Sequence, residues 1–321
     1  IPEPEPTPFQ TPSTTITPIA PIAKPVICSL LIFSDLKIII INIKNPIIQL
    51  GFWPGGDRDG NPFVTTEITL KVAERLRTSI LKCYYFEMRS LKRKLTFPGV
   101  DVLVSELEQK LYRSVFYSKG EIYITLEEFK SQLNKIKSIV VDQHQSLYFD
   151  EIEALLIKVN LFGFHFATLD IRQNSKIHDG VFKDVVKYYL NSGTNVFPEN
   201  YFQLTENEKF DVLSKVKGNL DPNAFDNEIT KSTLESIQAI KKIQVTNGES
   251  GADRYIISNN ESALNVMETF ALFHLNNWEN LSVDIIPLFE SVDDLQNAHE
   301  IMEKLYTNPA YASHLVEIGR A

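Results

Sequence analysis

Residues 53–65 read W-P-G-G-D-R-D-G-N-P-F-V-T and separate a short apolar run from a long helical pattern. Gly55, Gly56 and Gly60 allow positive φ angles or a close approach of the backbone to a ligand, and two prolines stiffen the stretch. An ordinary turn needs only about one glycine and one Asp or Asn side chain. This density of special residues therefore favours a loop that faces a ligand.

The charged residues of this loop leave two interpretations open. Asp57, Arg58 and Asp59 form a local charge cluster on a stiff frame. The cluster either faces a ligand, as functional loops do, or satisfies itself through a pair between Arg58 and one of the two aspartates. We favour the ligand-facing interpretation.

Four short apolar or alternating runs predict strands, and each precedes a helical pattern. They are residues 47–52, 164–172, 255–258 and 283–290. Polar residues gather where these runs stop, as they do at the catalytic face of a (β/α) barrel. The sequence therefore predicts a mostly helical α/β fold, a partial (β/α)8 TIM-type barrel with long helical insertions.

The longer periodic stretches predict helices over residues 65–94, 102–115, 126–140 and 149–161. Thr65 or Thr66, Thr125, Ser262 and Ser291 are candidate N-caps. Residues 191–251 are rich in Asn, Asp, Glu and Lys, which indicates a largely exposed helical insertion with loops.

The first 44 residues form a separate segment in this interpretation, followed by a domain from residue 45 to residue 321. Half of the sixteen prolines precede residue 26, which favours an extended tail or linker. The apolar stretch 26–43 is interrupted by Asp35 and Lys37, too short to span a membrane, and follows no signal-peptide pattern. The net charge of −9 argues against a nucleic-acid partner. We expect a cytoplasmic protein without a membrane partner.

Three motifs give the chain a family resemblance. The string W-x-G-G-D-R-D-G-N-P followed by V-T resembles the signature of phosphoenolpyruvate carboxylase. L-D-I-R-Q-N-S-K-I-H at 169–178 and I-I-P-L-F-E-S-V-D-D-L at 285–295 are similar to later motifs of that family, in the same order. The resemblance covers about residues 45–321. It implies an enzyme that joins phosphoenolpyruvate to bicarbonate, giving oxaloacetate and phosphate, with Mg²⁺ or Mn²⁺ as cofactor and a homotetramer as the intact form.

Arg172 is the first candidate site residue. It ends a predicted strand and shares a strand face with Asp170. A guanidinium there is suited to bidentate capture of a phosphate or carboxylate. Equally, an Arg172–Asp170 pair could serve only the register of the sheet. The resemblance implies that Arg172 binds the substrate phosphate.

Glu290 ends the apolar run V-D-I-I-P-L-F-E. A buried carboxylate at a strand end must be paired, hydrogen-bonded or bound to a hard cation. Alternatively, Glu290 belongs to the next turn and interacts with the dipole of the following helix. The resemblance implies that Glu290 is a ligand of the divalent metal, together with an aspartate from a later segment.

The glycine loop supplies the remaining candidates. Trp53 either plugs a barrel end or, as the resemblance implies, lines an apolar pocket for bicarbonate or carbon dioxide, where water must be excluded. We assign substrate contacts to Gly55, Gly56, Asp57 and Asp59, and we expect Arg58 to share the catalytic, charge-bearing role of Arg172.

The family's histidine string T-A-H-P-T is absent, as are its later strings S-D-x-x-K-D and G-R-G-G. We therefore expect a fragment without turnover of its own. Two alternatives stay open: another barrel enzyme that handles phosphoenolpyruvate and an enolate, or a non-catalytic helical scaffold.

Overall fold

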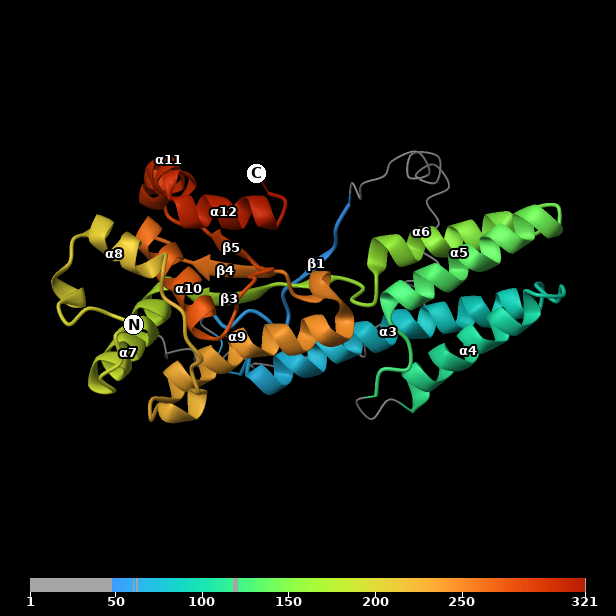
Figure 1. The fold of residues 1–321 in the computed structure, drawn as a ribbon, viewed down its shortest axis with the longest axis horizontal. Coiled ribbons are helices and arrows are strands. Elements are labelled where there is room, and N and C mark those ends of the chain that lie inside the picture. The colour runs from blue at the N-terminus through green and yellow to red at the C-terminus, as the bar shows by residue number, and fades with distance from the viewer. Residues whose placement is uncertain (1–47, 60, 62, 118–120, 321) are drawn as a thin grey trace, which may run out of the picture. The chain divides into compact units, whose positions relative to one another are not determined.

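The computed structural model describes residues 48–59, 61, 63–117 and 121–320 (Figure 1). The segment 1–44 that the sequence sets apart lies outside the described residues, as does Gly60. Within the described part, helices predominate around short parallel strands. This arrangement confirms the mostly helical α/β class.

The strands are short and parallel, and they follow chain order across the sheet. β1 (Gly51–Phe52) pairs with β2 (Thr168–Leu169). β3 (Ile171–Asn174), β4 (Arg254–Ser258) and β5 (Asp284–Pro287) form a second sheet in the order β3-β4-β5. Because only Asp170 separates β2 from β3, the two small sheets are joined through one continuous stretch of chain.

Two strand predictions need correction. Residues 164–167 are not part of a strand, because the backbone turns there, with Phe166 at a φ of 67°. Strand structure begins at Thr168 and continues to Asn174 after an interruption at Asp170. β5 ends at Pro287 and does not reach Glu290. The apolar run is therefore longer than the strand that it contains.

Each strand is followed by a helix, as predicted. α3 (Thr66–Lys92) follows β1, α7 (Ser175–Asn191) follows β3, α10 (Ala263–Leu275) follows β4 and α11 (Val292–Thr307) follows β5. At the four helix starts, a side-chain oxygen accepts a hydrogen bond from a backbone N–H group of the first turn. These oxygens belong to Thr65, Asn174, Ser262 and Ser291. These caps confirm the predicted starts at Thr65, Ser262 and Ser291, because each satisfies a donor that has no partner inside its helix.

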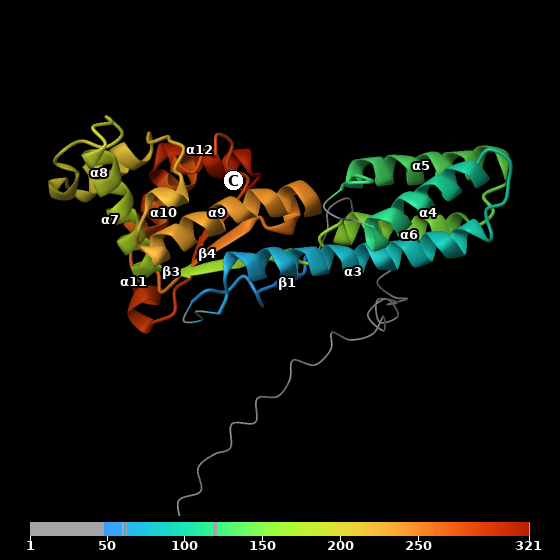
Figure 2. The same ribbon diagram turned by 90° about the horizontal axis from the view of Figure 1, so that it is seen from below.

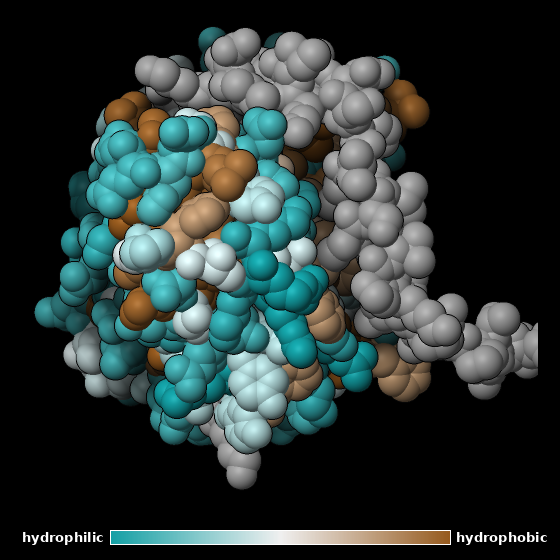
Figure 3. Space-filling model, turned by 90° about the vertical axis from the view of Figure 1, so that its right-hand side faces the viewer, coloured by the Kyte–Doolittle hydropathy of each residue, from teal (hydrophilic) through white to brown (hydrophobic). Residues whose placement is uncertain are grey.

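A helical bundle forms a second core. It consists of α3 together with α4 (Asp101–Phe116), α5 (Leu126–Gln143) and α6 (Phe149–Phe162), at the right of Figure 1. Its interior includes Tyr84, Met88, Leu107, Phe129 and Leu155. Figure 3 views the bundle from its outer end, where most of the surface is hydrophilic and hydrophobic residues are interspersed. α3 also contributes Ala73 to the core around the sheet and thus belongs to both cores.

The prediction of a largely exposed insertion at residues 191–251 is wrong. α9 (Glu228–Asn247) buries Leu234, Ile237 and Ile240 in the core around the sheet. α8 (Glu206–Leu213) and the segment before it bury Tyr201 and Phe210 there too. The apolar stripe of α9 has helical spacing, but the many polar residues of its outer face conceal it in the composition.

Figure 2 shows α3 as one continuous helix that extends from the region of β1 into the bundle. The last element is α12 (Pro309–Glu317), which contacts α11. Tyr311 of α12 donates a hydrogen bond from its hydroxyl to the carbonyl of Ile285 in β5, 3.0 Å away. None of the helices in the described residues is both long enough and apolar enough to cross a membrane.

Replacing Gly56 by alanine should destabilise the fold strongly. A Cβ at this position would lie 2.0 Å from the backbone carbonyl oxygen of Asp170, which cannot move without breaking the sheet. We expect a loss of about 3 kcal/mol in the free energy of unfolding, measured by urea denaturation. The control is Gly180→Ala within α7, where a Cβ meets no atom and should stabilise by about 0.5–1 kcal/mol. Equal stability of both variants would contradict the close approach.

Glu268 makes stability depend on pH. This α10 residue is 7% exposed, and burial raises the pKa of its carboxyl from 4.5 to about 8. Its proton is thus held more tightly in the folded chain. The free energy of unfolding should fall by up to about 1.4 kcal/mol per pH unit as pH rises from about 4.5 to about 8.

Glu268→Gln should remove this contribution and raise stability at pH 8, in denaturant titrations across that pH range. Glu303→Gln on the exposed face of α11 is the control and should leave the pH dependence unchanged. An identical pH dependence for Glu268→Gln and the unmodified chain would be the contrary result.

Candidate functional site

The glycine loop is a rigid turn fastened to α3. The N–H groups of Gly56 and Asp57 both donate to the carbonyl of Trp53, at 2.9 and 3.1 Å. Gly55 has a φ of +87°, and a Cβ there would lie 2.6 Å from Val72. The hydroxyl of Thr69 donates to the carbonyl of Gly55 at 2.7 Å. The predicted positive φ is therefore confirmed at Gly55, whereas Gly56 allows a close approach to the backbone of Asp170.

The loop then runs alongside β3 as an additional parallel segment. The N–H of Arg172 donates to the carbonyl of Gly56 at 2.9 Å, and the N–H of Arg58 donates to the carbonyl of Arg172 at 3.2 Å. This pairing sets Asp57 directly beside Arg172. Arg172 is the second residue of β3 and does not end the strand, as the sequence predicted, because the strand continues to Asn174. The loop and Arg172, which are more than a hundred residues apart in sequence, thus form one backbone unit.

The Arg172 guanidinium lies between two carboxylates without a tight partner. Its Nη1 is 3.8 Å from Asp57 Oδ2, and its Nη2 is 4.0 Å from Asp170 Oδ2. Its Nε is buried, with no hydrogen-bond partner among the described residues. The side chain is 27% exposed. Its two Nη groups, which have no carboxylate oxygen closer than 3.8 Å, are therefore suited to bidentate binding of a phosphate or carboxylate.

Arg58 points toward α9. Its guanidinium donates to the carbonyl of Ser232 at 2.8 Å and to the hydroxyl of the same residue. It does not form the self-satisfying pair with Asp57 or Asp59 that the sequence allowed. Burial lowers the pKa of the Arg58 guanidinium, and the nearby Tyr255 and Glu235 counteract that effect. Arg58 thus fastens the loop to the helix behind the sheet.

His178 lies in the same buried layer. It is fully buried, with its ring edge to face against Tyr255 at a centroid distance of 5.4 Å. Burial lowers the pKa of the imidazole to about 3, and the nearby Arg58 charge adds to that effect. The imidazole is therefore neutral at physiological pH, which fits a structural position behind the sheet.

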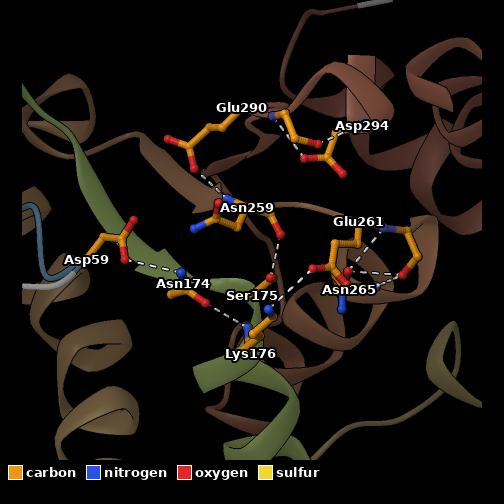
Figure 4. Close-up of polar contacts among 11 residues, drawn as sticks. Asp59, Asn174, Ser175, Lys176, Asn259, Glu261, Asn265, Glu290 and Asp294 are labelled. Atoms are coloured by element: carbon orange, nitrogen blue, oxygen red, sulfur yellow. Dashed lines mark hydrogen bonds and ion pairs between the residues drawn. The ribbon is translucent and has the colours of Figure 1, made fainter. Parts of the chain in front are cut away.

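Polar contacts connect the ends of the strands (Figure 4). The amide of Asn174 donates to Asp59 Oδ1 at 3.2 Å, which links the glycine loop to the end of β3. The hydroxyl of Ser175 donates to the carbonyl of Asn259 at 2.5 Å, and the N–H of Asn259 donates to Glu290 Oε2 at 2.9 Å. Hydrogen bonds of side chains and of the Asn259 backbone thus connect the ends of all four strand–helix units.

Glu290 lies at this edge but is exposed, so the expected burial of its carboxylate is wrong. It follows β5 by three residues and precedes Ser291, the N-cap of α11. Exposure, and the hydrogen bond from Asn259 to only one carboxylate oxygen, fit a hard oxygen ligand of a divalent cation. Among the described residues, no three His, Cys, Asp or Glu side chains gather as a complete metal site would require.

Trp53 follows β1 at the start of the loop, and its residue is 58% exposed. In the described part of the chain it is therefore not a buried plug.

Two residues of this region were not predicted from the sequence. Asn259 follows β4 with a φ of 49°, a conformation that asparagine tolerates better than most residues, and it links Ser175 to Glu290. Its position directly after a predicted strand was the available signal. Arg254 begins β4, and its Nε lies 3.0 Å from Asp170 Oδ1. No local pattern distinguishes this arginine from an exposed one.

The fold and this edge define an α/β protein in which linked polar and carboxylate side chains lie at the carboxyl ends of parallel strands, the usual place for a ligand site in such folds. Comparison with known proteins makes this class specific. The family model of phosphoenolpyruvate carboxylase matches residues 40–115 and 101–320. The chain belongs to the phosphoenolpyruvate carboxylase family.

Two curated relatives give the extent of the similarity. The phosphoenolpyruvate carboxylase of Nitrosomonas eutropha is 31% identical over 317 residues, which cover 84% of this chain and 33% of the relative. That of Nitrosomonas europaea is 28% identical over 321 residues, covering 84% and 34%. The chain therefore spans about a third of the length of these relatives.

Removing the Arg58 guanidinium should loosen the glycine loop. In Arg58→Met, the loop loses two hydrogen bonds to Ser232, so amide hydrogen exchange in residues 53–59 should accelerate roughly tenfold or more. Ser232→Ala keeps the carbonyl acceptor and should have a smaller effect. Arg75→Met, on an exposed position of α3, is the matched control. Unchanged exchange in Arg58→Met would show that the loop does not depend on this contact.

Proposed function

We propose that this chain is the part of a phosphoenolpyruvate carboxylase that binds the substrate phosphate and contributes to the metal site. The reaction joins phosphoenolpyruvate and bicarbonate to give oxaloacetate and phosphate. The observation that carries the proposal is the Arg172 guanidinium, whose donors lack tight partners beside a rigid glycine loop. Family membership supports it.

The chemistry assigns a different task to each part of the site. A bicarbonate oxygen attacks the phosphorus, which releases the enolate of pyruvate and forms carboxyphosphate. Carbon dioxide lost from carboxyphosphate, with release of phosphate, is then trapped by the enolate carbon. Arg172 bears charge on the phosphoryl group during the first step. Trp53 contributes an apolar wall, since water would protonate the enolate and hydrolyse carboxyphosphate.

The glycine loop supports these tasks. Gly55 and Gly56 bring backbone close to the substrate region, while Asp57 and Asp59 hold Arg172 and Asn174 in place. Arg58 serves by fastening the loop to α9. Glu290 would hold part of a Mg²⁺ or Mn²⁺ site, and the bound ion would supply a Lewis acid for the enolate oxygen.

The fold supports a larger assembly around this site. We propose that the four strand–helix units are consecutive units of a (β/α)8 TIM-type barrel, because their strands are parallel and in chain order. α4, α5 and α6 are then an insertion between the first and second units, packed against the far part of α3. A homotetrameric, cytoplasmic enzyme is the form that family membership favours.

Calorimetric titration tests this function. The chain should bind phosphoenolpyruvate in the presence of Mn²⁺, and Arg172→Met should weaken binding at least about tenfold, because charged hydrogen bonds to the phosphate are lost. Arg113→Met, on the exposed face of α4, is the control. We expect no bicarbonate-dependent oxaloacetate in an assay coupled to malate dehydrogenase, since the chain spans about a third of its relatives. Absence of binding, as for a scaffold, would refute the proposal.

A further inference from the structure

Asp170 has two arginine neighbours at unequal distances. Arg254 Nε lies 3.0 Å from its Oδ1, whereas Arg172 Nη2 lies 4.0 Å from its Oδ2. Arg172 belongs to β3 and Arg254 to β4, and Asp170 is the single residue between β2 and β3. Asp170 therefore forms a short ion pair with Arg254, without hydrogen-bond geometry, and a longer one with Arg172.

In its ionised form, the buried Asp170 carboxylate depends on a nearby positive charge. Asp170 is 8% exposed, and burial raises the pKa of its carboxyl, while Arg254 and, less strongly, Arg172 counteract this effect. A buried carboxylate takes whichever cation can reach it. Without Arg254, the remaining cation within reach would be the Arg172 guanidinium.

The pair is enclosed on the side of β1. A Cβ at Gly51 would lie 3.2 Å from Arg254 Nη2 and 3.4 Å from Asp170 Oδ2, so the glycine leaves room for the ion pair. Arg254 also has Asp253 Oδ1 at 3.8 Å from its Nε. Two carboxylates thus hold the Arg254 guanidinium, and the tighter contact is with Asp170.

We propose that Arg254 is a positioning residue that occupies Asp170 and so keeps the Arg172 guanidinium available for the substrate phosphate. The part of this inference that concerns phosphate binding rests on the proposed function. The geometric part, that Arg254 keeps Arg172 and Asp170 apart, stands independently of any substrate.

The geometric part is tested by the structure of Arg254→Met. In that variant Arg172 should move onto Asp170 and form a direct hydrogen bond of about 2.8 Å, as charge-assisted pairs do. A separation that stays near 4 Å would overturn the inference, whether or not the chain binds phosphoenolpyruvate. Arg254→Lys is a milder variant in case Arg254→Met does not fold, and Arg172 should again move closer to Asp170 if the lysine fails to reach it.

Binding provides the second test, by calorimetry of the full 321-residue chain with phosphoenolpyruvate and Mn²⁺. Arg254→Met should weaken binding at least about tenfold, because Arg172 becomes engaged by Asp170. The double variant Arg254→Met with Asp170→Asn should recover affinity to within about threefold of Asp170→Asn alone, because the competing charge is gone.

A purely structural role for Arg254 predicts a different pattern. Both the single and the double variant would then bind weakly, and affinity would follow thermal stability measured on the same samples. Either that pattern or undiminished binding by Arg254→Met would overturn the inference. Failure of the unmodified chain to bind would instead refute the proposed function, and the structural test would still decide the geometry.

Discussion

The backbone pairing between the glycine loop and β3 is the constraint on which the site depends. Two hydrogen bonds, from Arg172 to Gly56 and from Arg58 to Arg172, align a turn near the start of the domain with a strand more than a hundred residues later. The approach is possible because Gly56 has no side chain where the Asp170 carbonyl lies. Once this alignment is made, the side chains on either side of it have defined neighbours.

Three arginines lie around this pairing, and they differ in how closely the protein contacts their guanidinium groups. The Arg172 guanidinium lies 3.8 and 4.0 Å from the nearest carboxylate oxygens of Asp57 and Asp170. Arg58 instead donates a hydrogen bond to Ser232, and Arg254 forms an ion pair with Asp170 at 3.0 Å. Anion-binding sites profit from such contrast, because a cation that is already neutralised by the protein gains little from a ligand. Arg58 and Arg254 have the shorter contacts of the three arginines, and Arg172 has the longer ones.

Much of this site could be predicted because its signals are local. The glycines of the loop, the caps at Thr65, Ser262 and Ser291, and the polar residues at strand ends each depend on a few neighbouring positions. Contacts such as Arg58 with Ser232 join residues 174 positions apart, and no local pattern reports them. The buried face of α9 and the exposure of Glu290 were misjudged for the same reason, since burial depends on which elements pack together.

The double membership of α3 has a mechanical consequence. This helix of 27 residues is about 40 Å long. Thr69 in its first turn donates a hydrogen bond to Gly55 of the glycine loop, and the helix continues into the interior of the bundle. The first turns of α3 contact the loop, and the longer remaining part packs among α4, α5 and α6. Because α3 contacts both the glycine loop and the bundle interior, a displacement of the bundle would reach the loop through a single helix.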